Sequence, residues 1–446
     1  MPTSNGVEGA TPRWVIRRRS TPRRAWVVAV LLLAVFAPPA RARLVPVGGE
    51  FRVSTGAAAL PTSPAVAMDS SGGSIVVWGK GGDIAGRRFD SAGRPLGDEL
   101  LANTSTSAFH VKPAVAADAV GGFVVVWESY EPEPSDYVIR GQRFDASGAP
   151  VGGEFLVDTA TTDRQYHPLV AIDPAGGFLL VWEGHALRGS TLDSSGIFAQ
   201  RYDDGAEPIG DELRISGSTR FAGAPALATD SAFNLTLVWE GAGEEGAGIF
   251  GRRYDAAGGA VGDVFQISDR TPDAQLAPAV AMDEAGGLVV VWQRAAAYVS
   301  QVMGRRYDRN GMPAGDVFAV TANTGYINAA PRVATVPSGG FLVVWEKDDL
   351  TRLYFAPGDI AARQYPPNGA PAGLEIRVNR NRGGDQRLPA VTVDATGSVV
   401  VVWHTLPGDS SEAAIFGRRY AASSLAERTR RIGRSMRRGS STRVTR

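Results

Sequence analysis

A run of apolar residues that ends in tryptophan recurs seven times along the chain, as in Phe123–Trp127 (FVVVW). Consecutive apolar residues predict a strand buried on both faces, because each face of such a strand packs against another layer. The tryptophans that close the runs are 49 to 58 residues apart and are Trp78, Trp127, Trp182, Trp239, Trp292, Trp345 and Trp403. A repeat of this length with several short strands is typical of a β-propeller.

Four strands can be traced in each repeat. The first begins with a proline such as Pro113, the second is the apolar run, the third resembles Gly86–Asp90 (GRRFD), and the fourth resembles Gly152–Val157 (GGEFLV). An aspartate nine residues before the tryptophan is expected to cap the first turn through its own backbone. These aspartates are Asp69, Asp118, Asp173, Asp230, Asp283 and Asp394, and the sixth repeat has Val336 instead. The pattern predicts an all-β fold, a seven-bladed propeller with four antiparallel strands per blade.

The repeats begin out of phase with the chain. Gly48–Val53 (GGEFRV) matches the fourth strand of a unit, whereas the seventh unit stops after its third strand, at Tyr420. Pairing the first strand of the chain with the last blade would leave no unpaired edge there, and unpaired edges are costly. We therefore expect a propeller over residues 43–420 that is closed by its N-terminal strand.

The two ends of the chain differ from the repeats. A basic segment, the apolar run Ala25–Ala37 and the small residues around Ala42 predict a signal peptide over residues 1–42, with cleavage after about Ala42. This predicts a secreted protein, extracellular or periplasmic, with no transmembrane segment in the mature chain. Residues 421–446 are polar and rich in arginine, which predicts a disordered basic tail.

Charge and composition exclude several classes of function. Between Leu44 and Tyr420 there are 30 lysines and arginines against 44 acidic residues, so this acidic body is not expected to bind nucleic acid. The chain has no cysteine, which excludes disulfides and thiolate chemistry. It also lacks the Gly-x-Ser-x-Gly, P-loop and His-Glu-x-x-His motifs of common enzymes. A carboxylate pair for glycoside hydrolysis stays open, because such pairs have no fixed spacing.

An arginine recurs in the third strand and is followed by an aromatic residue. Because the second and third strands are neighbours, we expect these arginines to pair with the glutamates that follow four of the tryptophans, or to lie over a tryptophan face. A ring of ligand sites built on the same arginines is an alternative. The arginines are Arg88, Arg143, Arg201, Arg253, Arg306 and Arg419, with Gln364 in the sixth repeat, and the glutamates are Glu128, Glu183, Glu240 and Glu346.

The connection between the second and third strands varies most between repeats, and variable loops on a constant scaffold commonly carry function. It shares one face of the ring with the connections between blades. All four histidines (His110, His167, His185 and His404) are assigned to loops of this face, as surface residues. Aromatic and charged side chains there suit a polar ligand such as a sugar. The candidate ligand-binding residues are Tyr130, Asp136, Tyr137, His185, Arg188, Asp193, Tyr298, Asp348, Tyr354 and His404.

The segments Ile197–Asp203 (IFAQRYD) and Gly176–Trp182 (GGFLLVW), followed by Gly210–Leu213 (GDEL), resemble repeats of large secreted bacterial proteins of the adhesin and repeats-in-toxin kind. The resemblance covers residues 48–420. It implies an exported surface or extracellular protein, often associated with calcium. The nonapeptide calcium repeats of such proteins are missing from this chain.

The favoured function is a non-catalytic binding or interaction module, lectin-like or for recognition of a cell surface. One alternative is an extracellular carbohydrate-active hydrolase or lyase with its site in the central funnel, and another is a structural spacer held to the envelope by the basic tail. The expected partner is a polar ligand, a glycan or a surface protein, and the chain is expected to be a monomer. No catalytic residue, metal ligand or cofactor is assigned, and calcium is left open.

Overall fold

This computed structural model describes residues 44–56, 60–105, 108–131, 136–157, 164–185, 195–217, 221–243, 246–297, 299–322, 325–349, 357–381, 383–407 and 413–422. All of them belong to one compact unit, Ala42–Arg446. A second unit, Met1–Arg41, lies outside the described residues, as do residues 423–446. The signal peptide and the basic tail therefore stay predictions.

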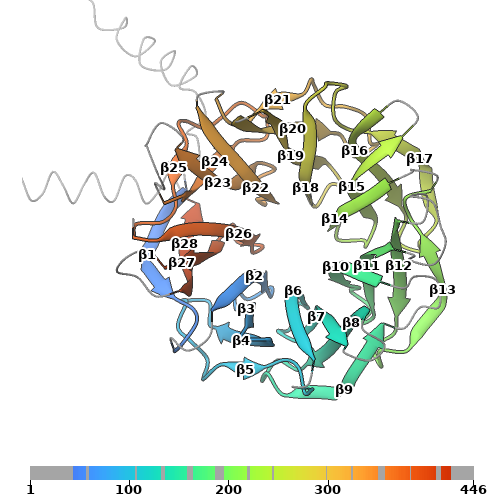
Figure 1. Ribbon diagram of the computed structural model, residues 1–446, viewed down its shortest axis with the longest axis vertical. Helices are drawn as coiled ribbons and strands as arrows, with labels where there is room; N and C mark the ends of the chain where they lie inside the picture. The colour runs from blue at the N-terminus through green and yellow to red at the C-terminus, as the bar shows by residue number, and fades with distance from the viewer. Residues whose placement is uncertain are drawn as a thin grey trace, which may run out of the picture. The chain divides into compact units, whose positions relative to one another are not determined.

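The described strands form seven antiparallel sheets of four strands each, arranged as blades in a ring (Figure 1). The inner strands of blades 1 to 7 are β2 (Pro61–Met68), β6 (Phe109–Ala117), β10 (Arg164–Ile172), β14 (Phe221–Thr229), β18 (Ala274–Met282), β22 (Tyr326–Thr335) and β26 (Asp385–Val393). The second strands are β3 (Ser74–Lys80), β7 (Phe123–Glu131), β11 (Phe178–His185), β15 (Leu235–Gly243), β19 (Leu288–Ala296), β23 (Phe341–Asp349) and β27 (Val399–Leu406).

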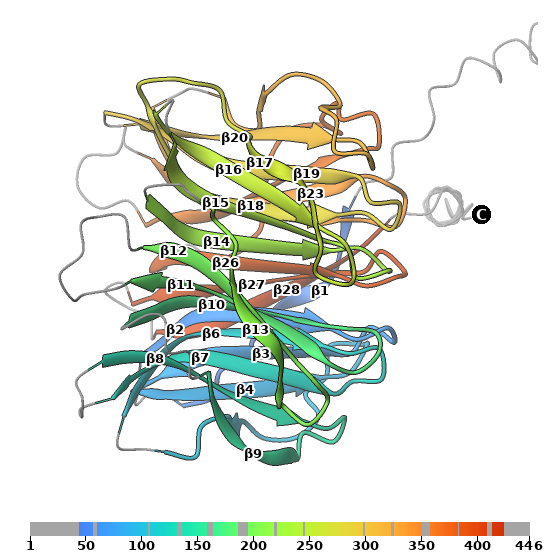
Figure 2. The ribbon, with the colours of Figure 1, turned by 90° about the vertical axis from the view of Figure 1, so that its right-hand side faces the viewer.

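The third strands are β4 (Asp83–Phe89), β8 (Asp136–Phe144), β12 (Gly196–Tyr202), β16 (Gly246–Tyr254), β20 (Val299–Tyr307), β24 (Asp359–Tyr365) and β28 (Ala414–Ala422). The outer strands are β5 (Leu100–Leu101), β9 (Pro150–Val157), β13 (Pro208–Arg214), β17 (Ala260–Gln266), β21 (Phe318–Ala319), β25 (Ile376–Arg377) and, for blade 7, β1 (Leu44–Arg52). Each inner strand lies beside those of the two neighbouring blades, and Figure 2 shows the blades edge-on, with their strands crossing between the two faces of the ring. The predicted fold class is confirmed.

The N-terminal strand closes the ring, as predicted. β1 pairs with β28 from Leu44 opposite Ala422 to Arg52 opposite Phe416, with one bulge. The contact continues beyond the strand, where the backbone N–H of Val53 donates to the carbonyl of Ile415 at 2.8 Å. Strands from the two ends of the chain thus share one blade, which leaves no open edge.

The tryptophans pack between blades. Each is at most 1% exposed. Trp182 of blade 3, for example, packs with Val124 and Val126 of blade 2, and Trp78 of blade 1 packs with Val402 of blade 7. The second strands are therefore buried on both faces, as the apolar runs predicted, because each lies in a sheet covered by two neighbours.

A bulge recurs near the start of every inner strand. The residue before the proline has a φ between 46° and 53°, a left-handed conformation that is unusual for any residue other than glycine and disfavoured before proline. In four blades a glutamate of the preceding blade accepts the backbone N–H of this residue: Glu128 from His167 (2.7 Å), Glu183 from Ala224 (2.9 Å), Glu240 from Ala277 (2.5 Å) and Glu346 from Leu388 (2.6 Å). These charge-assisted bonds stabilise the bulge and tie each blade to the next.

The recurrent arginines also join blades. Arg88 donates to the carbonyls of Ala146 (2.5 Å) and Ser147 in the next blade, and Arg253 and Arg306 make equivalent bonds to later blades. The expected pairing of these arginines with the glutamates of the same blade is therefore wrong. The glutamate side chains bond to the bulges near the channel, whereas the arginine side chains extend to the turn of the neighbouring blade, so the two do not pair.

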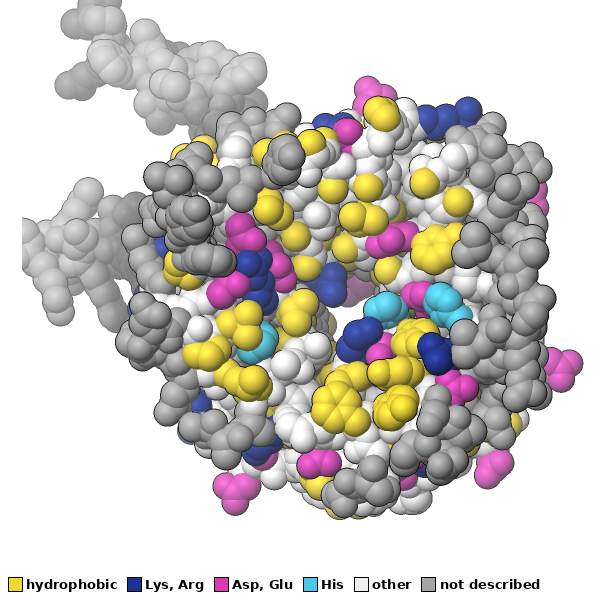
Figure 3. Space-filling view, in the orientation of Figure 1, with side chains coloured by type: hydrophobic (Ala, Val, Ile, Leu, Met, Phe, Trp, Pro, Cys, Tyr) yellow, Lys and Arg dark blue, Asp and Glu magenta, His cyan; other side chains and the backbone are white. Residues whose placement is uncertain are grey.

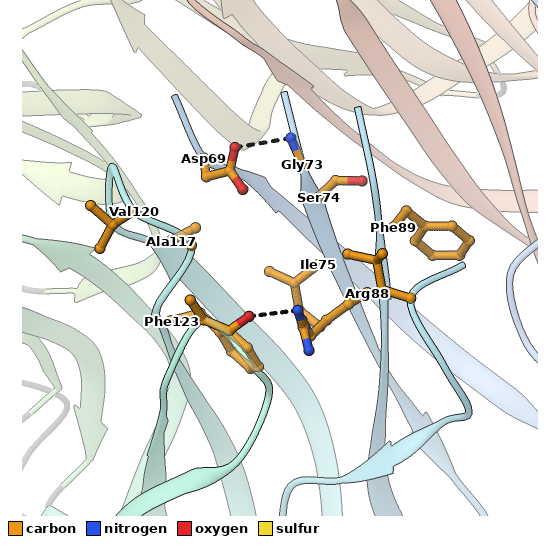
Figure 4. Close-up of a pocket in the computed structure, with 12 residues that line it drawn as sticks. Asp69, Gly73, Ser74, Ile75, Arg88, Phe89, Ala117, Val120 and Phe123 are labelled. Carbon is orange, nitrogen blue, oxygen red and sulfur yellow. Dashed lines mark hydrogen bonds between the residues drawn. The ribbon is translucent and has the colours of Figure 1, made fainter. Parts of the chain in front are cut away.

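The aspartates of the first turns accept backbone hydrogen bonds from residues two and four positions later. The Oδ1 atom of Asp69 accepts from Ser71 (2.8 Å) and Gly73 (2.9 Å). Figure 4 shows this turn at a cavity of about 190 Å³ between blades 1 and 2, with Arg88 beside it. The donors of Arg88 are directed to backbone carbonyls, so this cavity is part of the packing between blades.

Deleting residues 48–54 should destabilise the protein strongly. If each lost ladder hydrogen bond contributes about 1 kcal/mol, the loss is several kcal/mol, and the melting temperature should fall by roughly 10 °C. Differential scanning calorimetry of the variant, with deletion of residues 440–446 as the matched control, measures this. An unchanged melting temperature for the first deletion would refute closure by β1.

Candidate functional site

A cavity of about 520 Å³ lies at the centre of the ring, and all seven blades line it. In six blades its wall consists of the bulge residue, the proline and the one or two residues that follow, and blade 6 contributes Arg332 and Val333. Figure 3 shows the face on which this cavity opens, with histidine, lysine and arginine side chains gathered around the central hollow. Because the seven walls have the same backbone, their chemistry differs only where a side chain departs from the repeat.

Three side chains that line the cavity depart from the repeat, and all three are basic. The bulge position holds Lys112 in blade 2 and His167 in blade 3, but alanine, serine or leucine in the other blades. The position after the proline holds Arg332 in blade 6, and alanine or leucine elsewhere. None of the described residues that line the cavity is acidic. A basic cavity within an acidic body favours the entry of an anion.

Glu183 organises the blade 3 side of the cavity. Its Oε2 atom lies 2.9 Å from Nδ1 of His167 and also accepts the backbone N–H of Ala224, while its Oε1 atom lies 2.6 Å from Nε2 of His185. The Nε2 atom of His167 lies 3.2 Å from Nζ of Lys112. With Nδ1 donating to the carboxylate, a neutral His167 presents the lone pair of Nε2 toward Lys112, as a base oriented by a carboxylate does.

The environment sets the charge of Glu183 and of its neighbour Glu240. Burial by itself would raise the pKa of Glu183, but the hydrogen bonds from His167, His185 and Ala224 outweigh it and hold this pKa well below its usual range. Burial raises the pKa of Glu240, which accepts only one backbone hydrogen bond and is repelled by Glu183. Glu183 is therefore ionised at neutral pH and keeps the tautomer of His167 fixed.

An aromatic ladder leads from blade 2 to this network. The ring of Tyr130 lies 5.1 Å from that of Tyr137, Tyr137 lies 5.2 Å from Tyr166, and Tyr166 meets the edge of His185 at 5.5 Å. We call Tyr130, Tyr137, Tyr166 and His185 the aromatic ladder. Such half-exposed aromatic rings beside charged groups offer stacking surfaces for a sugar.

The structure brings four of the predicted ligand-binding residues together. Tyr130, Tyr137 and His185 belong to the aromatic ladder. The carboxylate of Asp136 lies beside it, 3.4 Å from Nε of Arg164. Arg188, Asp193, Tyr298 and Tyr354 lie outside the described residues.

Asp348 and His404 belong to a second group, in blades 6 and 7, on the other side of the ring in Figure 1. Arg387 donates to Asp348 at 2.6 Å and to Glu346 at 3.2 Å, and it also contacts Asp385 at 2.8 Å. His404 lies opposite Arg387 in the paired strands. The three carboxylates of this group share one arginine, which is the arrangement of a structural ion-pair network.

The expectation that the histidines lie in loops is wrong for all four, since His110, His167, His185 and His404 lie in strands. His110 and His404 are also buried, with at most 4% exposure. His110 sits edge-on to Trp127 with a ring separation of 6.0 Å, and burial lowers the pKa of His404. The strands extend further into the variable connections than the repeat pattern suggested, so residues assigned to loops are inside sheets.

Lys112, Tyr166, His167, Glu183 and Arg332 were not among the predicted ligand-binding residues. Glu183 was assigned to structural contacts between strands on the basis of its recurrence. The signal that finds Lys112, His167 and Arg332 is a comparison of equivalent positions in the seven repeats at the residues on either side of the first proline. There, a basic side chain replaces alanine, serine or leucine.

Among the described residues there is no group of three or more His, Asp or Glu side chains with the arrangement of a metal site. The described residues also contain no helix that could span a membrane. Calcium binding and export stay predictions.

No family model and no curated protein matches this chain. Among solved structures, the polysaccharide lyase Uly1 matches with a TM-score of 0.52 and 9% identity over 85% of this chain and 100% of that one. A protein of unknown function from Dyadobacter fermentans has a TM-score of 0.50 and 12% identity over 85% and 99% of the two chains. A fungal alcohol oxidase of the AA5 family, in complex with copper, has the same score and identity over 85% and 76%.

Identities this low show a shared propeller fold and nothing finer. The three proteins differ in what their descriptions say of their chemistry, so the fold does not select a function. The resemblance to adhesin repeats stays a prediction as well.

Replacing Glu183 with Gln should destabilise the protein by roughly 2–4 kcal/mol at pH 7, because a buried acceptor of three hydrogen bonds loses its charge. The pKa of Glu183 is lower in the folded state than its ordinary value of 4.5. Its contribution is therefore fully present above about pH 4.5 and is lost as the pH falls toward the folded pKa. Urea unfolding of both proteins at pH 7 and pH 3.5 measures the difference, which should shrink at the lower pH.

Glu207→Gln is the matched control, since Glu207 is exposed in a turn. It should change stability by less than about 0.5 kcal/mol. Equal effects of the two substitutions would contradict the role of Glu183.

Proposed function

We propose that this protein is a carbohydrate-active enzyme that binds a saccharide at the aromatic ladder and acts on it at the mouth of the central cavity. The observation that carries the proposal is the convergence of Lys112, His167, Glu183 and His185 from blades 2 and 3 within hydrogen-bonding distance of one another. A structural network does not need a base at a channel mouth, and His167 retains 43% exposure of its side chain there. Perturbed groups that meet in a cavity are typical of active sites.

His167 is the general base in this proposal. Glu183 fixes the Nδ1 proton, and Nε2 accepts from Lys112 until a ligand takes over the Lys112 ammonium, after which Nε2 can take a proton from the substrate. The aromatic ladder holds the sugar rings and sets their distance from Nε2. That the polysaccharide lyase Uly1 has the same fold is consistent with this use of a propeller.

A non-catalytic, lectin-like module is the second candidate. The tyrosines of the aromatic ladder favour it, because tyrosine rings can stack against sugars without catalysing a reaction. In that case His167 would only orient the ligand, and its removal would weaken binding without abolishing a reaction.

His167→Ala should reduce turnover by at least about 100-fold, the usual contribution of a general base. The fold should tolerate it, since Ala224, Ala277 and Ala330 occupy the equivalent bulges with the same backbone conformation. Residues 43–446 are incubated with a panel of neutral and acidic polysaccharides, and new reducing ends and unsaturated products are measured. The melting temperature of the variant should stay within a few degrees of the parent.

Tyr166→Ala separates binding from catalysis. It should raise KM by roughly threefold to tenfold with a smaller change in kcat, because one stacking surface of the aromatic ladder is lost. If the parent protein binds on a glycan array, with or without calcium, but turns over no polysaccharide, the binding module is correct and the enzyme is not.

A further inference from the structure

One of the three basic side chains that line the cavity is Arg332 of blade 6. Among the described residues Arg332 makes no ion pair, and the one hydrogen bond of its guanidinium is to the carbonyl of Pro331 at 2.9 Å. Arg332 is exposed to the water of the cavity; desolvation by the surrounding wall lowers the pKa of Arg332, and the carboxylate of Glu346 acts in the opposite direction. A guanidinium that faces the water of the cavity can bind an anion that enters it.

The repeat shows that the scaffold does not need this arginine. The equivalent residue is alanine in five of the other blades and leucine in the sixth: Ala65, Ala114, Leu169, Ala226, Ala279 and Ala390. These positions have the same place beside the bulge and line the same cavity. Arg332 is thus a departure from the repeat that adds a positive charge where the fold is stable without one.

Lys112 adds a second positive charge to the same cavity. Its Nζ atom lies 3.2 Å from both Nε2 of His167 and the buried carboxylate of Glu128. Its side chain keeps 45% exposure, so Nζ has room for another acceptor. An anionic group held by Lys112 would lie directly beside the base proposed above.

We propose that the substrate is an acidic saccharide, a uronate polymer, whose carboxylates are bound in the channel, one at Lys112 and another at Arg332, while His167 starts β-elimination. This inference rests on the proposed function, since it uses the same base. Cations near a sugar carboxylate stabilise the charge that develops when the adjacent C–H bond is broken.

The step balances without a further reactant. Nε2 of His167 takes the proton from the ring carbon that bears the carboxylate, and the electron pair of that bond forms a double bond to the neighbouring carbon. The bond from that neighbour to the glycosidic oxygen breaks. The leaving oxygen takes a proton from water, and protonated His167 returns its proton to the solvent. One product has an unsaturated uronate end and the other a new hydroxyl.

The test compares Arg332→Ala and Lys112→Ala with the parent on four kinds of probe: polygalacturonate and alginate as uronates, carrageenan as a sulfated polymer, dextran as a neutral polymer, and methyl-esterified polygalacturonate. Ultraviolet absorbance of the unsaturated end is followed together with new reducing ends. On uronates each variant should lose roughly 30- to 1000-fold in kcat/KM, the usual effect of removing a charge that contacts an opposite charge. Arg94→Ala, on an 80% exposed side chain in a turn, is the control for net charge and should be unaffected.

Each outcome has one meaning. The inference is supported if the parent forms the unsaturated end on polygalacturonate, acts more weakly on the methyl ester, and loses its activity on polygalacturonate in both variants. Action on carrageenan or dextran alone, abolished by His167→Ala but not by Arg332→Ala, overturns it and leaves the proposed function in place. If no probe is turned over, calorimetric titration with oligogalacturonate decides. If the parent binds and Arg332→Ala does not, an acidic ligand is supported and the proposed enzymatic function is wrong. If the parent does not bind, the acidic ligand and the enzymatic function are both wrong.

Discussion

The left-handed bulge before each inner-strand proline is the constraint on which the ring and its cavity depend. It brings the chain toward the axis, and it frees a backbone N–H that a glutamate of the preceding blade accepts in four of the seven interfaces. Because the same conformation recurs in every blade, the strain it carries belongs to the scaffold and not to a site. Chemistry in the cavity therefore depends on the side chains on and directly after each bulge, as Lys112, His167 and Arg332 show.

Most of the fold follows from local patterns. Apolar runs ending in tryptophan predict doubly buried strands, and a fourth-strand motif near Gly48 together with a missing fourth strand after Tyr420 predicts ring closure; the structure has both. The bulges could not be predicted, because alanine and leucine at these positions give no sign of a positive φ. The partners of Arg88 could not be predicted either, since they depend on the distance between blades.

The candidate site was only partly accessible to sequence reasoning. Tyr130, Tyr137 and His185 attract notice as aromatic or titratable residues in variable segments, and they lie together. Glu183 does not attract notice, because it shares its position with glutamates that only hold bulges. The second role of Glu183, which is to orient His167, depends on His167 and His185 lying on either side of its carboxylate. That arrangement results from strand pairing and not from spacing along the chain.

The acidic residues that hold the blades together and the basic residues that line the channel occupy different positions of the repeat. This explains why a body with an excess of acidic residues can contain a basic channel. Turn aspartates and bulge glutamates recur because every blade needs acceptors for its backbone N–H groups, and they account for part of the negative charge. Lys112, His167 and Arg332 do not recur, and they occupy positions where the repeat tolerates alanine. Acidic residues that serve the fold are already bonded, so the basic residues of the channel determine which ligand the cavity attracts.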